Sequence, residues 1–426
     1  MTSIPYTSRE TDLELPGDGV RPGWRVPART LAALAVGAAM ATSSIVFSEP
    51  AIADVLMAAV LVGLPILGVV RFGPVSVLNF AALLIFVALG LAACSDSTNF
   101  GTAVIHKVVT LFLVGGSFVS AGYVADDPVP RFRLIMICYV VGCLLATAAA
   151  FAGYFRLLPA AYDLFTAYGR ARGTFKDPNV LGAALAPAIV YTAWIALRHP
   201  LKEAMIAAVV CVPLCLALLL SFSRGAWAMT ALSLVVVAWL AFVTTRRASD
   251  LARFAVVGAL GLFVMVAAIA AALQVEAVSS LFAERASLDQ SYDKGPEGRF
   301  GGQAKAVGLI LGHPFGIGTH TFRDTYHDEE AHNVYLSQFL NAGWVGGSLY
   351  AISVLGTLAA GAYAARRRTA LQGPLIVTTA SFLGVVAEGA IIDTDHWRHF
   401  FLLLGLIWGL VDAATPKPNT EARHDD

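Results

Sequence analysis

Two apolar runs meet at a short polar turn in the middle of the chain. Residues 204–220 read AMIAAVVCVPLCLALLL, the turn is Ser221-Phe222-Ser223-Arg224, and residues 225–243 read GAWAMTALSLVVVAWLAFV. A helix needs roughly 20 apolar residues to cross about 30 Å of hydrocarbon. Each run approaches that length with almost no loop between them, so the stretch predicts a pair of helices that crosses a membrane and turns back.

The composition of the whole chain agrees with this interpretation. Of 426 residues, 57% are hydrophobic and 14% are charged, with a mean hydropathy of +0.70. Soluble globular proteins have about 25% charged residues, so a soluble enzyme is excluded, as are disordered and collagen-like chains. Lys+Arg and Asp+Glu each number 29, which gives no support for a nucleic-acid surface. The five cysteines form no C-x-x-C, so neither a disulfide framework nor a zinc framework is predicted.

Further apolar runs predict an all-α integral membrane protein with about twelve transmembrane helices. One large periplasmic loop, 276–331, lies between the ninth and tenth spans. The predicted spans are 31–47, 52–70, 75–93, 103–124, 134–155, 180–197, 204–220, 225–243, 254–275, 343–364, 374–392 and 399–413. We divide the chain into a cytoplasmic tail (1–29), nine spans (30–275), the loop (276–331), three spans (332–413) and a second cytoplasmic tail (414–426).

The orientation follows from the short loops, because Lys and Arg collect on the cytoplasmic side. An internal N-terminus places seventeen of the 29 cations inside: Arg9, Arg21, Arg25, Arg29, Arg71, Arg131, Arg133, Arg198, Lys202, Arg246, Arg247, Arg253, Arg366, Arg367, Arg368, Lys417 and Arg423. The other cations concentrate before residue 180, in the turn at 221–224 and in the loop at 276–331. Cations on the outer side suggest a bound anion.

The first of these places is the stretch RARGTFKDPN at 170–179. Pro178 favours an extended Asp177, and either Asp177 or Asn179 is placed to cap a helix that begins near Val180. An ordinary capped helix start explains the pattern. Alternatively, Arg172 and Lys176 beside a helix N-terminus suit a phosphate.

The second place is the turn itself. Arg224 at the membrane boundary could simply reach lipid headgroups. The tight turn limits its freedom, however, and Ser221, Ser223 and Gly225 add hydroxyl and backbone donors beside it. A guanidinium among small residues suits bidentate binding of a diphosphate.

The third place is the long loop. Arg299 precedes a helix-compatible stretch at 303–311, and His313 before Pro314 is interpreted as structural. His332 lies at the start of the next helical run, where a neutral imidazole can accept a proton or can merely cap the helix. The spacing of His327, Asp328, Glu329, Glu330 and His332 matches no zinc motif, so no metal is predicted.

Several charges lie at predicted span ends. Asp54 is near the outer end of the second span, and His106 and Lys107 are expected to reach the interface at the start of the fourth. Glu388 is the deepest acid of the eleventh span and could bind a sugar hydroxyl or pair with Arg224. Around its outer end follow Asp393, Asp395 and His396.

Together these stretches resemble the O-antigen ligase/O-antigen polymerase family of bacterial envelope glycosyltransferases. The resemblance rests on four motifs in order: RGTFKDPN at 172–179, SFSRG at 221–225, HPFGIG at 313–318 and HNVYL at 332–336.

The resemblance implies a GT-C type glycosyltransferase that needs no metal or other cofactor and inverts the transferred sugar. It implies a donor glycan on undecaprenyl diphosphate and a hydroxyl acceptor, either lipid A-core or another lipid-linked glycan. The family's two arginines then correspond to Arg224 and Arg299. The residues themselves add Arg172 as a third diphosphate-binding residue, with Lys176 and Glu388 as secondary candidates. His332 is the catalytic candidate, in a bacterial inner membrane protein whose active site faces the periplasm.

Ligase and polymerase activity, for lipopolysaccharide or exopolysaccharide, remain alternatives at this point. A transporter or flippase is a different class, in which repeated halves and polar groups at mid-membrane depth are expected. A scaffold without activity is a third. In this chain the candidate site residues are all predicted on the outer side of the membrane, and no internal repeat is visible. Both observations favour an enzyme.

Overall fold

The structure is a computed structural model that describes residues 27–245, 248–286 and 295–415, and these are almost entirely helical. The helices are α1 (Ala28–Thr42), α2 (Ile52–Ile66), α3 (Pro74–Ala93), α4 (Phe100–Asp126), α5 (Pro128–Tyr154), α6 (Ala161–Phe165), α7 (Pro178–Arg198), α8 (Leu201–Leu220), α9 (Arg224–Thr244), α10 (Ala248–Ala272), α11 (Glu276–Ala286), α12 (Arg299–Gly312), α13 (Val334–Ala364), α14 (Gln372–Glu388) and α15 (Arg398–Ala414). A 3-10 turn, η1 (Cys94–Asp96), follows α3, and a π turn, η3 (Phe322–Tyr326), precedes α13. The strands β1 (Thr166–Ala167) and β2 (Arg170–Ala171) form a small antiparallel pair.

Each predicted span overlaps one helix, which confirms an all-helical membrane protein. Among the described residues, eight helices are long and apolar enough to cross a membrane. The helices α1 and α2 have 15 residues each, and α14 and α15 have 17 each. The number of twelve spans therefore stays a prediction, as do the boundaries at 29–30, 275–276, 331–332 and 413–414.

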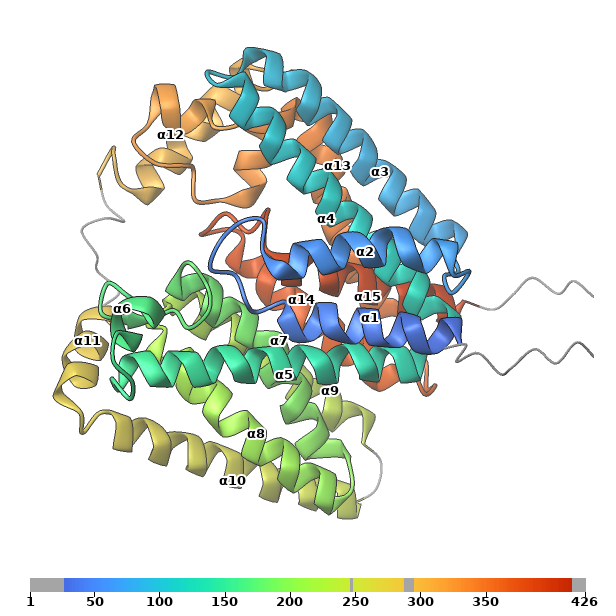
Figure 1. The fold of residues 1–426 in the computed structure, drawn as a ribbon, viewed down its shortest axis with the longest axis vertical. Helices are drawn as coiled ribbons and strands as arrows, with labels where there is room; N and C mark the ends of the chain where they lie inside the picture. The colour runs from blue at the N-terminus through green and yellow to red at the C-terminus, as the bar shows by residue number, and fades with distance from the viewer. Residues whose placement is uncertain (1–26, 246–247, 287–294, 416–426) are drawn as a thin grey trace, which may run out of the picture.

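The two ends of the described chain lie on the same side of the helix bundle. Figure 1 shows the start of α1 and the end of α15 at one end, and α6, α11 and α12 at the opposite end. This arrangement agrees with an even number of crossings. The predicted tails outside 27–415 and several predicted inner cations lie outside the described residues: Arg9, Arg21, Arg25, Arg246, Arg247, Lys417 and Arg423.

The core has two large apolar clusters that share α15. One joins α1, α5, α7 and α8, and the other joins α3, α4, α13 and α14. α15 packs along α4 and also contacts α14 and α13. A small third cluster, which includes Ala306, Phe322 and Leu340, holds α12 and η3 against the start of α13. Because α12 lies beside the ends of the spanning helices, its residues can face the groups that those ends present.

Candidate functional site

Arg224 is the first residue of α9. The preceding residue, Ser223, is the N-cap, and its hydroxyl accepts a hydrogen bond from the backbone N–H of Ala226 at 3.4 Å. Phe222 is buried with a φ of 47°, which turns the chain sharply between α8 and α9. The guanidinium therefore lies at the N-terminal, electropositive end of a long helix, where an anion is favoured.

A second arginine, Arg170, holds this turn in place through a side-chain hydrogen bond. Its Nε donates to the carbonyl of Ser221 at 2.7 Å, and its Nη2 donates to Oδ1 of Asn179 at 2.7 Å. Arg170 is 7% exposed; its bond to Ser221 is buried and its bond to Asn179 is partly buried. It thereby joins the turn to the first residues of α7. The sequence places Arg170 in a motif but offers no signal that separates it from Arg172.

Arg172 donates both to the segment before α7, through Nη1 to the carbonyl of Lys176 at 3.5 Å, and to α6. Its Nη2 donates to the carbonyl of Leu164 at 3.1 Å, near the C-terminal end of α6. Asp177, as expected, caps α7, because its carboxylate accepts from the N–H of Asn179 at 2.7 Å. Lys176 forms an ion pair with Glu49 at 3.1 Å. The diphosphate-binding role assigned to Arg172 and Lys176 stays a prediction.

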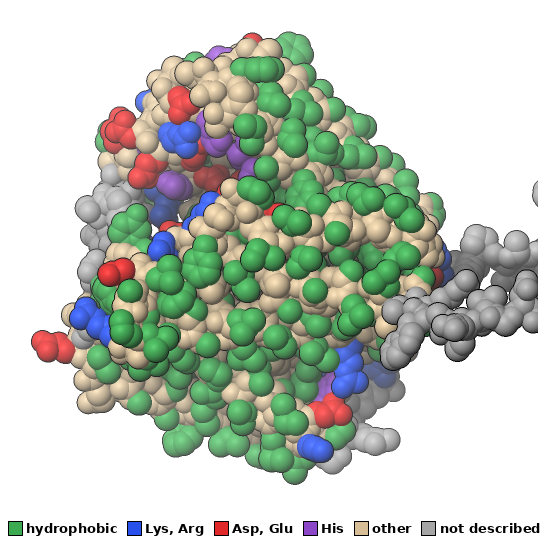
Figure 2. Space-filling view, in the orientation of Figure 1, with side chains coloured by type: hydrophobic (Ala, Val, Ile, Leu, Met, Phe, Trp, Pro, Cys, Tyr) green, Lys and Arg blue, Asp and Glu red, His purple; other side chains and the backbone are tan. Residues whose placement is uncertain are grey.

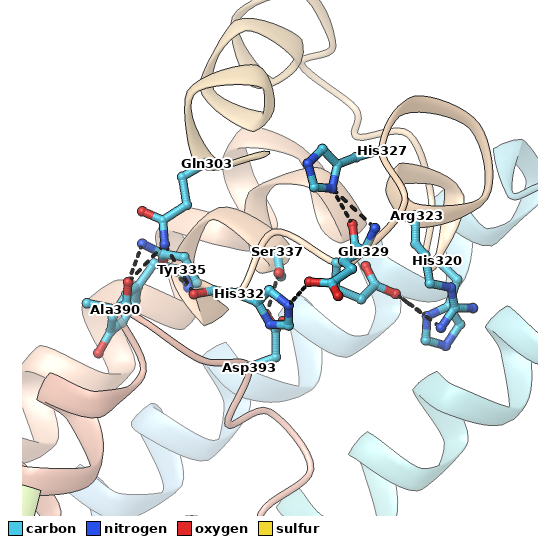
Figure 3. Close-up of polar contacts among 12 residues, drawn as sticks. Gln303, His320, Arg323, His327, Glu329, His332, Tyr335, Ser337, Ala390 and Asp393 are labelled. Atoms are coloured by element: carbon cyan, nitrogen blue, oxygen red, sulfur yellow. Dashed lines mark hydrogen bonds and ion pairs between the residues drawn. The ribbon is translucent and has the colours of Figure 1, made fainter. Parts of the chain in front are cut away.

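His332 lies immediately before α13, with a φ of 48°. Its Nε2 is 2.9 Å from Oε2 of Glu329, and its Nδ1 is 3.8 Å from Oδ2 of Asp393 (Figure 3). The helix is capped by Asn333, whose Oδ1 accepts from the N–H groups of Tyr335 and Leu336. Since Asn333 is the cap, the imidazole of His332 is available for side-chain chemistry.

The start of α13 is tied to the end of α14, which in turn touches the start of α9. The N–H of Val334 donates to the carbonyl of Gly389 at 2.8 Å, and Nδ2 of Asn333 donates to the carbonyl of Ala390 at 3.1 Å. A Cβ on Gly225 would lie 2.6 Å from Oε1 of Glu388, so this buried carboxylate rests against the α9 turn. The contacts bring the His332 and Arg224 segments into one neighbourhood.

The short helix α12 faces the same place. Gln303 donates through Nε2 to the carbonyls of His332 and Ala390, at 3.2 and 3.3 Å. Arg299 lies four residues earlier on α12 and therefore on the same helical face. Arg224 and Arg299 begin α9 and α12, Glu388 ends α14 and His332 precedes α13, and the contacts above join these helix ends at one end of the bundle.

The molecular surface is hollowed at this end. Figure 2 shows charged and histidine side chains around the hollow, whereas hydrophobic side chains cover most of the rest of the visible face. Glu388 is 4% exposed, and its Oε2 has no hydrogen-bond partner among the described residues. The predicted pairing of Glu388 with Arg224 and the predicted sugar contact both remain untested.

A second polar cluster is formed by the start of α4 and the loop between α14 and α15. The Nε2 of His106 is 3.5 Å from Oδ2 of Asp395, and the His106 ring stacks on the His396 ring at 3.9 Å. Lys107 is fully buried beside them, 5.5 Å from the centre of the Phe86 ring. The expectation that Lys107 reaches the interface is therefore wrong, because its helix face packs against α3 rather than pointing outward.

This loop holds carboxylates with opposed pKa values. Burial would raise the pKa of Asp395, but the neighbouring His396, His106 and Lys107 lower it to about 2. Burial, with the nearby charge of Asp395, raises the pKa of Asp393 to about 6. Burial also lowers the pKa of His396. Titratable pairs whose pKa values are pushed apart are typical of functional sites.

The residues with the best metal-ligand spacing are His106, Asp395 and His396, whose ligand atoms lie within 4.8 Å of one another. Two of these three side chains already have hydrogen-bond partners within the protein. Nε2 of His396 bonds to the hydroxyl of Thr110 at 3.0 Å, and Oδ2 of Asp395 accepts from Gln338 at 3.4 Å. His327 and His332 both contact Glu329, but His327 contacts its backbone and His332 its carboxylate (Figure 3).

A cavity of about 270 Å³ opens near the same loop and runs between α1, α2, α4 and α15. Its mouth carries two ion pairs: Lys176 with Glu49, and Arg398 with Asp54 through two hydrogen bonds of 2.7 and 2.8 Å. Its deeper walls are mostly apolar, with Met57, Leu113 and Phe401 among them. A wider hollow of about 610 Å³ between α5, α7, α8 and α14 lies toward the other end of the bundle.

Fold and site together define an all-helical membrane protein with arginine and histidine groups clustered at one end. Residues 206–351 match the family model described as O-antigen ligase. The matched segment runs from α8 into α13 and contains Arg224, Arg299 and His332, so the resemblance drawn from the motifs is confirmed over these residues. The domain indicates a glycosyltransferase-like role in bacterial polysaccharide biosynthesis, with lipid-linked glycans as substrates. A comparison with curated proteins found no significant match.

Proposed function

We propose that this protein transfers a glycan from undecaprenyl diphosphate to a hydroxyl acceptor on the periplasmic side of the bacterial inner membrane. The observation that carries the proposal is the meeting of the Arg224 turn, Arg299 and His332 at the end of the bundle where α6, α11 and α12 lie. Glycosyl transfer from a diphosphate needs cations at the leaving group and a base at the incoming hydroxyl.

Arg224, Arg299 and Arg172 bind the diphosphate, and Lys176 is a secondary candidate. As the bond between the anomeric carbon and the diphosphate oxygen breaks, negative charge grows on that oxygen, and guanidinium groups stabilise it. The N-terminal end of α9 adds its dipole to the charge of Arg224. Glu388, buried beside Gly225, is placed to accept a hydrogen bond from a sugar hydroxyl or to orient Arg224.

His332 acts on the acceptor from the other side of the anomeric carbon. Its imidazole takes the proton of the acceptor hydroxyl or orients that hydroxyl for attack. Attack opposite the leaving diphosphate inverts the configuration of the sugar, and the chemistry described requires no metal. The cavity between α1, α2, α4 and α15 offers apolar walls to the polyprenyl chain.

The test uses purified protein in detergent with undecaprenyl-diphosphate-linked glycan, and measures release of undecaprenyl diphosphate. We expect Arg224→Ala and His332→Ala each to lower the rate by about 10²-fold or more, the usual effect of removing one transition-state group. Arg323→Ala is the matched control, because Arg323 is 44% exposed in the same loop and pairs with Asp324. Transfer that survives both active-site substitutions would sink the proposal, and a transporter would release no diphosphate at all.

Analysis of the surface polysaccharide of a deletion strain identifies the acceptor. Single repeat units on lipid A-core indicate a lost polymerase, whereas lipid-linked polymer that accumulates indicates a lost ligase. Loss of secreted polymer with unchanged lipopolysaccharide indicates an exopolysaccharide polymerase. Complementation with the wild-type chain and with His332→Ala then connects the phenotype to the site.

A further inference from the structure

His332 has a carboxylate at each ring nitrogen, and the two carboxylates differ in exposure. Glu329, at Nε2, is 68% exposed, so water competes for its contact. Asp393, at Nδ1, has a side chain that is 22% exposed and comes from the loop between α14 and α15. The less exposed partner is the one that can hold the ring in a fixed orientation, whereas the exposed partner can be exchanged for a ligand.

Asp393 is itself held in place. Its Oδ1 accepts a hydrogen bond from the hydroxyl of Ser337 at 2.7 Å, and Ser337 lies on the first turn of α13. The other oxygen, Oδ2, faces Nδ1 of His332 at 3.8 Å, a distance that a small side-chain movement closes. Such contacts are often long before substrate binds and tighten in the reacting complex.

We propose that Asp393 is the positioning residue of His332: it accepts the Nδ1 proton and so leaves Nε2 as the nitrogen that meets the acceptor hydroxyl. This inference rests on the proposed function, and it adds the group that selects the tautomer. A carboxylate can only accept a hydrogen bond, so contact with Asp393 requires the proton to be on Nδ1. The acceptor hydroxyl takes the place of Glu329 at Nε2.

The transfer forms one bond to the anomeric carbon and breaks another. The acceptor oxygen forms a bond to the anomeric carbon while the bond from that carbon to the diphosphate oxygen breaks, and its electron pair leaves with the diphosphate. The acceptor proton moves to Nε2 of His332. The resulting imidazolium then carries a proton on each nitrogen, and the negative charge of Asp393 stabilises it.

The arrangement makes transfer depend on pH through Asp393. The groups that face it are Asp395 in its own loop, His332 and Glu330 from the segment before α13, and Ser337 on α13. Because its pKa is raised to about 6, Asp393 becomes protonated below about pH 6 and can no longer accept from Nδ1. Asp395 contributes to that rise, so Asp395→Asn lowers the pKa of Asp393 and moves the acidic limb of kcat to lower pH.

The test compares Asp393→Asn with Glu329→Gln, since each replaces an acid by its amide at one nitrogen of the same imidazole. We expect Asp393→Asn to lower kcat about 10- to 100-fold, the range found for carboxylates that orient metal-bound histidines, with KM for the donor changed less than about threefold. Asp393→Glu should restore part of the rate. Asp328→Asn, an exposed acid in the loop before α13, controls for the loss of one charge.

Each outcome separates the inference from the proposed function. If His332→Ala abolishes transfer while Asp393→Asn does not, the positioning role is wrong and the proposed function stands. A large loss in Glu329→Gln with none in Asp393→Asn would make Glu329 the orienting group. Thermal unfolding in detergent identifies a variant that fails to fold. In that case the pH dependence of kcat in Asp395→Asn tests the proposal, because an acidic limb that does not move to lower pH contradicts it.

Discussion

At the scale of single residues, two arginines two positions apart have different surroundings. Arg170 is buried and joins the Ser221 turn to α7, whereas Arg172 donates to the carbonyl of Leu164 in α6. The stretch RARGTFKDPN contains both, and nothing in it predicts which of the two is the buried one. Only the antiparallel pairing of β1 with β2 directs Arg170 toward the turn that carries Arg224.

We therefore predict that Arg170→Ala destabilises the protein by about 2–4 kcal/mol, because two hydrogen bonds of a charged group, one buried and one partly buried, are lost. The Arg224 turn should loosen with it, so kcat should fall as well. Arg172→Ala, whose lost bonds are longer and more exposed, should cost less in both measurements. Thermal unfolding in detergent and diphosphate release check this, and equal effects of the two variants would contradict it.

At the scale of elements, α13 bends where it passes the loop at 313–318. Gly343 interrupts the helix with a φ of 69° and a ψ of −173°. A Cβ there would lie 2.4 Å from the carbonyl oxygen of Pro314 and 2.6 Å from the backbone of Phe315. The N–H of Trp344 donates to the same carbonyl of Pro314 at 2.9 Å. The kink thus anchors the loop that follows α12.

Gly343→Ala should cost at least about 2 kcal/mol, because it adds both a left-handed strain and a clash with backbone. The displaced loop at 313–318 should in turn shift α12 and lower the rate of glycan transfer. Gly356→Ala is a matched control in the same helix, since nothing lies within 4 Å of its added Cβ. That control should be neutral or stabilising by up to about 1 kcal/mol. Comparison of the two melting temperatures in detergent tests this, and similar values would refute it.

At the scale of the whole molecule, one loop connects the His332 site to the cavity. Asp393 faces His332, while His396 and Arg398 belong to the cavity mouth. The cavity walls come from α1, α2 and α4 in the first third of the chain and from α15 at its end. If a polyprenyl chain occupies the cavity, the lipid end and the reacting end of the donor lie on the two sides of this loop.

Filling the cavity tests this arrangement. A Cβ on Gly116 would be 3.5 Å from Met57, an ordinary contact, so Gly116→Leu extends into the cavity without a clash at its base. We expect kcat/KM to fall about tenfold for the undecaprenyl-linked donor, which corresponds to about 1.4 kcal/mol of lost contact, and to change little for a donor with a short prenyl chain. Gly63→Leu, on α2 with open space around it, is the control. Equal losses with both donors would exclude the cavity as the chain site.

The sequence predicted the parts of the site that are local. Asp177 as the cap of α7, a short helix near 303–311 and a helix that starts beside His332 all follow from residue types within a few positions. Capping and turn chemistry are decided by neighbours along the chain, so they can be read there. The contact of Lys107 with the core was missed, because the partners that bury it come from α3, about twenty residues away in the sequence.

By itself, the sequence determined that this chain is a helical membrane protein, and its ordered motifs predicted the resemblance to the O-antigen ligase family that the family match over residues 206–351 supports. These properties depend on composition, hydropathy and the order of short motifs. Only the tertiary structure decided which charges share a neighbourhood. Asp393 beside His332, and Arg170 beneath the Arg224 turn, are pairs across helix ends. Such pairs arise from the packing of α7, α9, α13 and α14, because side-chain contacts between spans follow the geometry of the bundle rather than spacing along the chain.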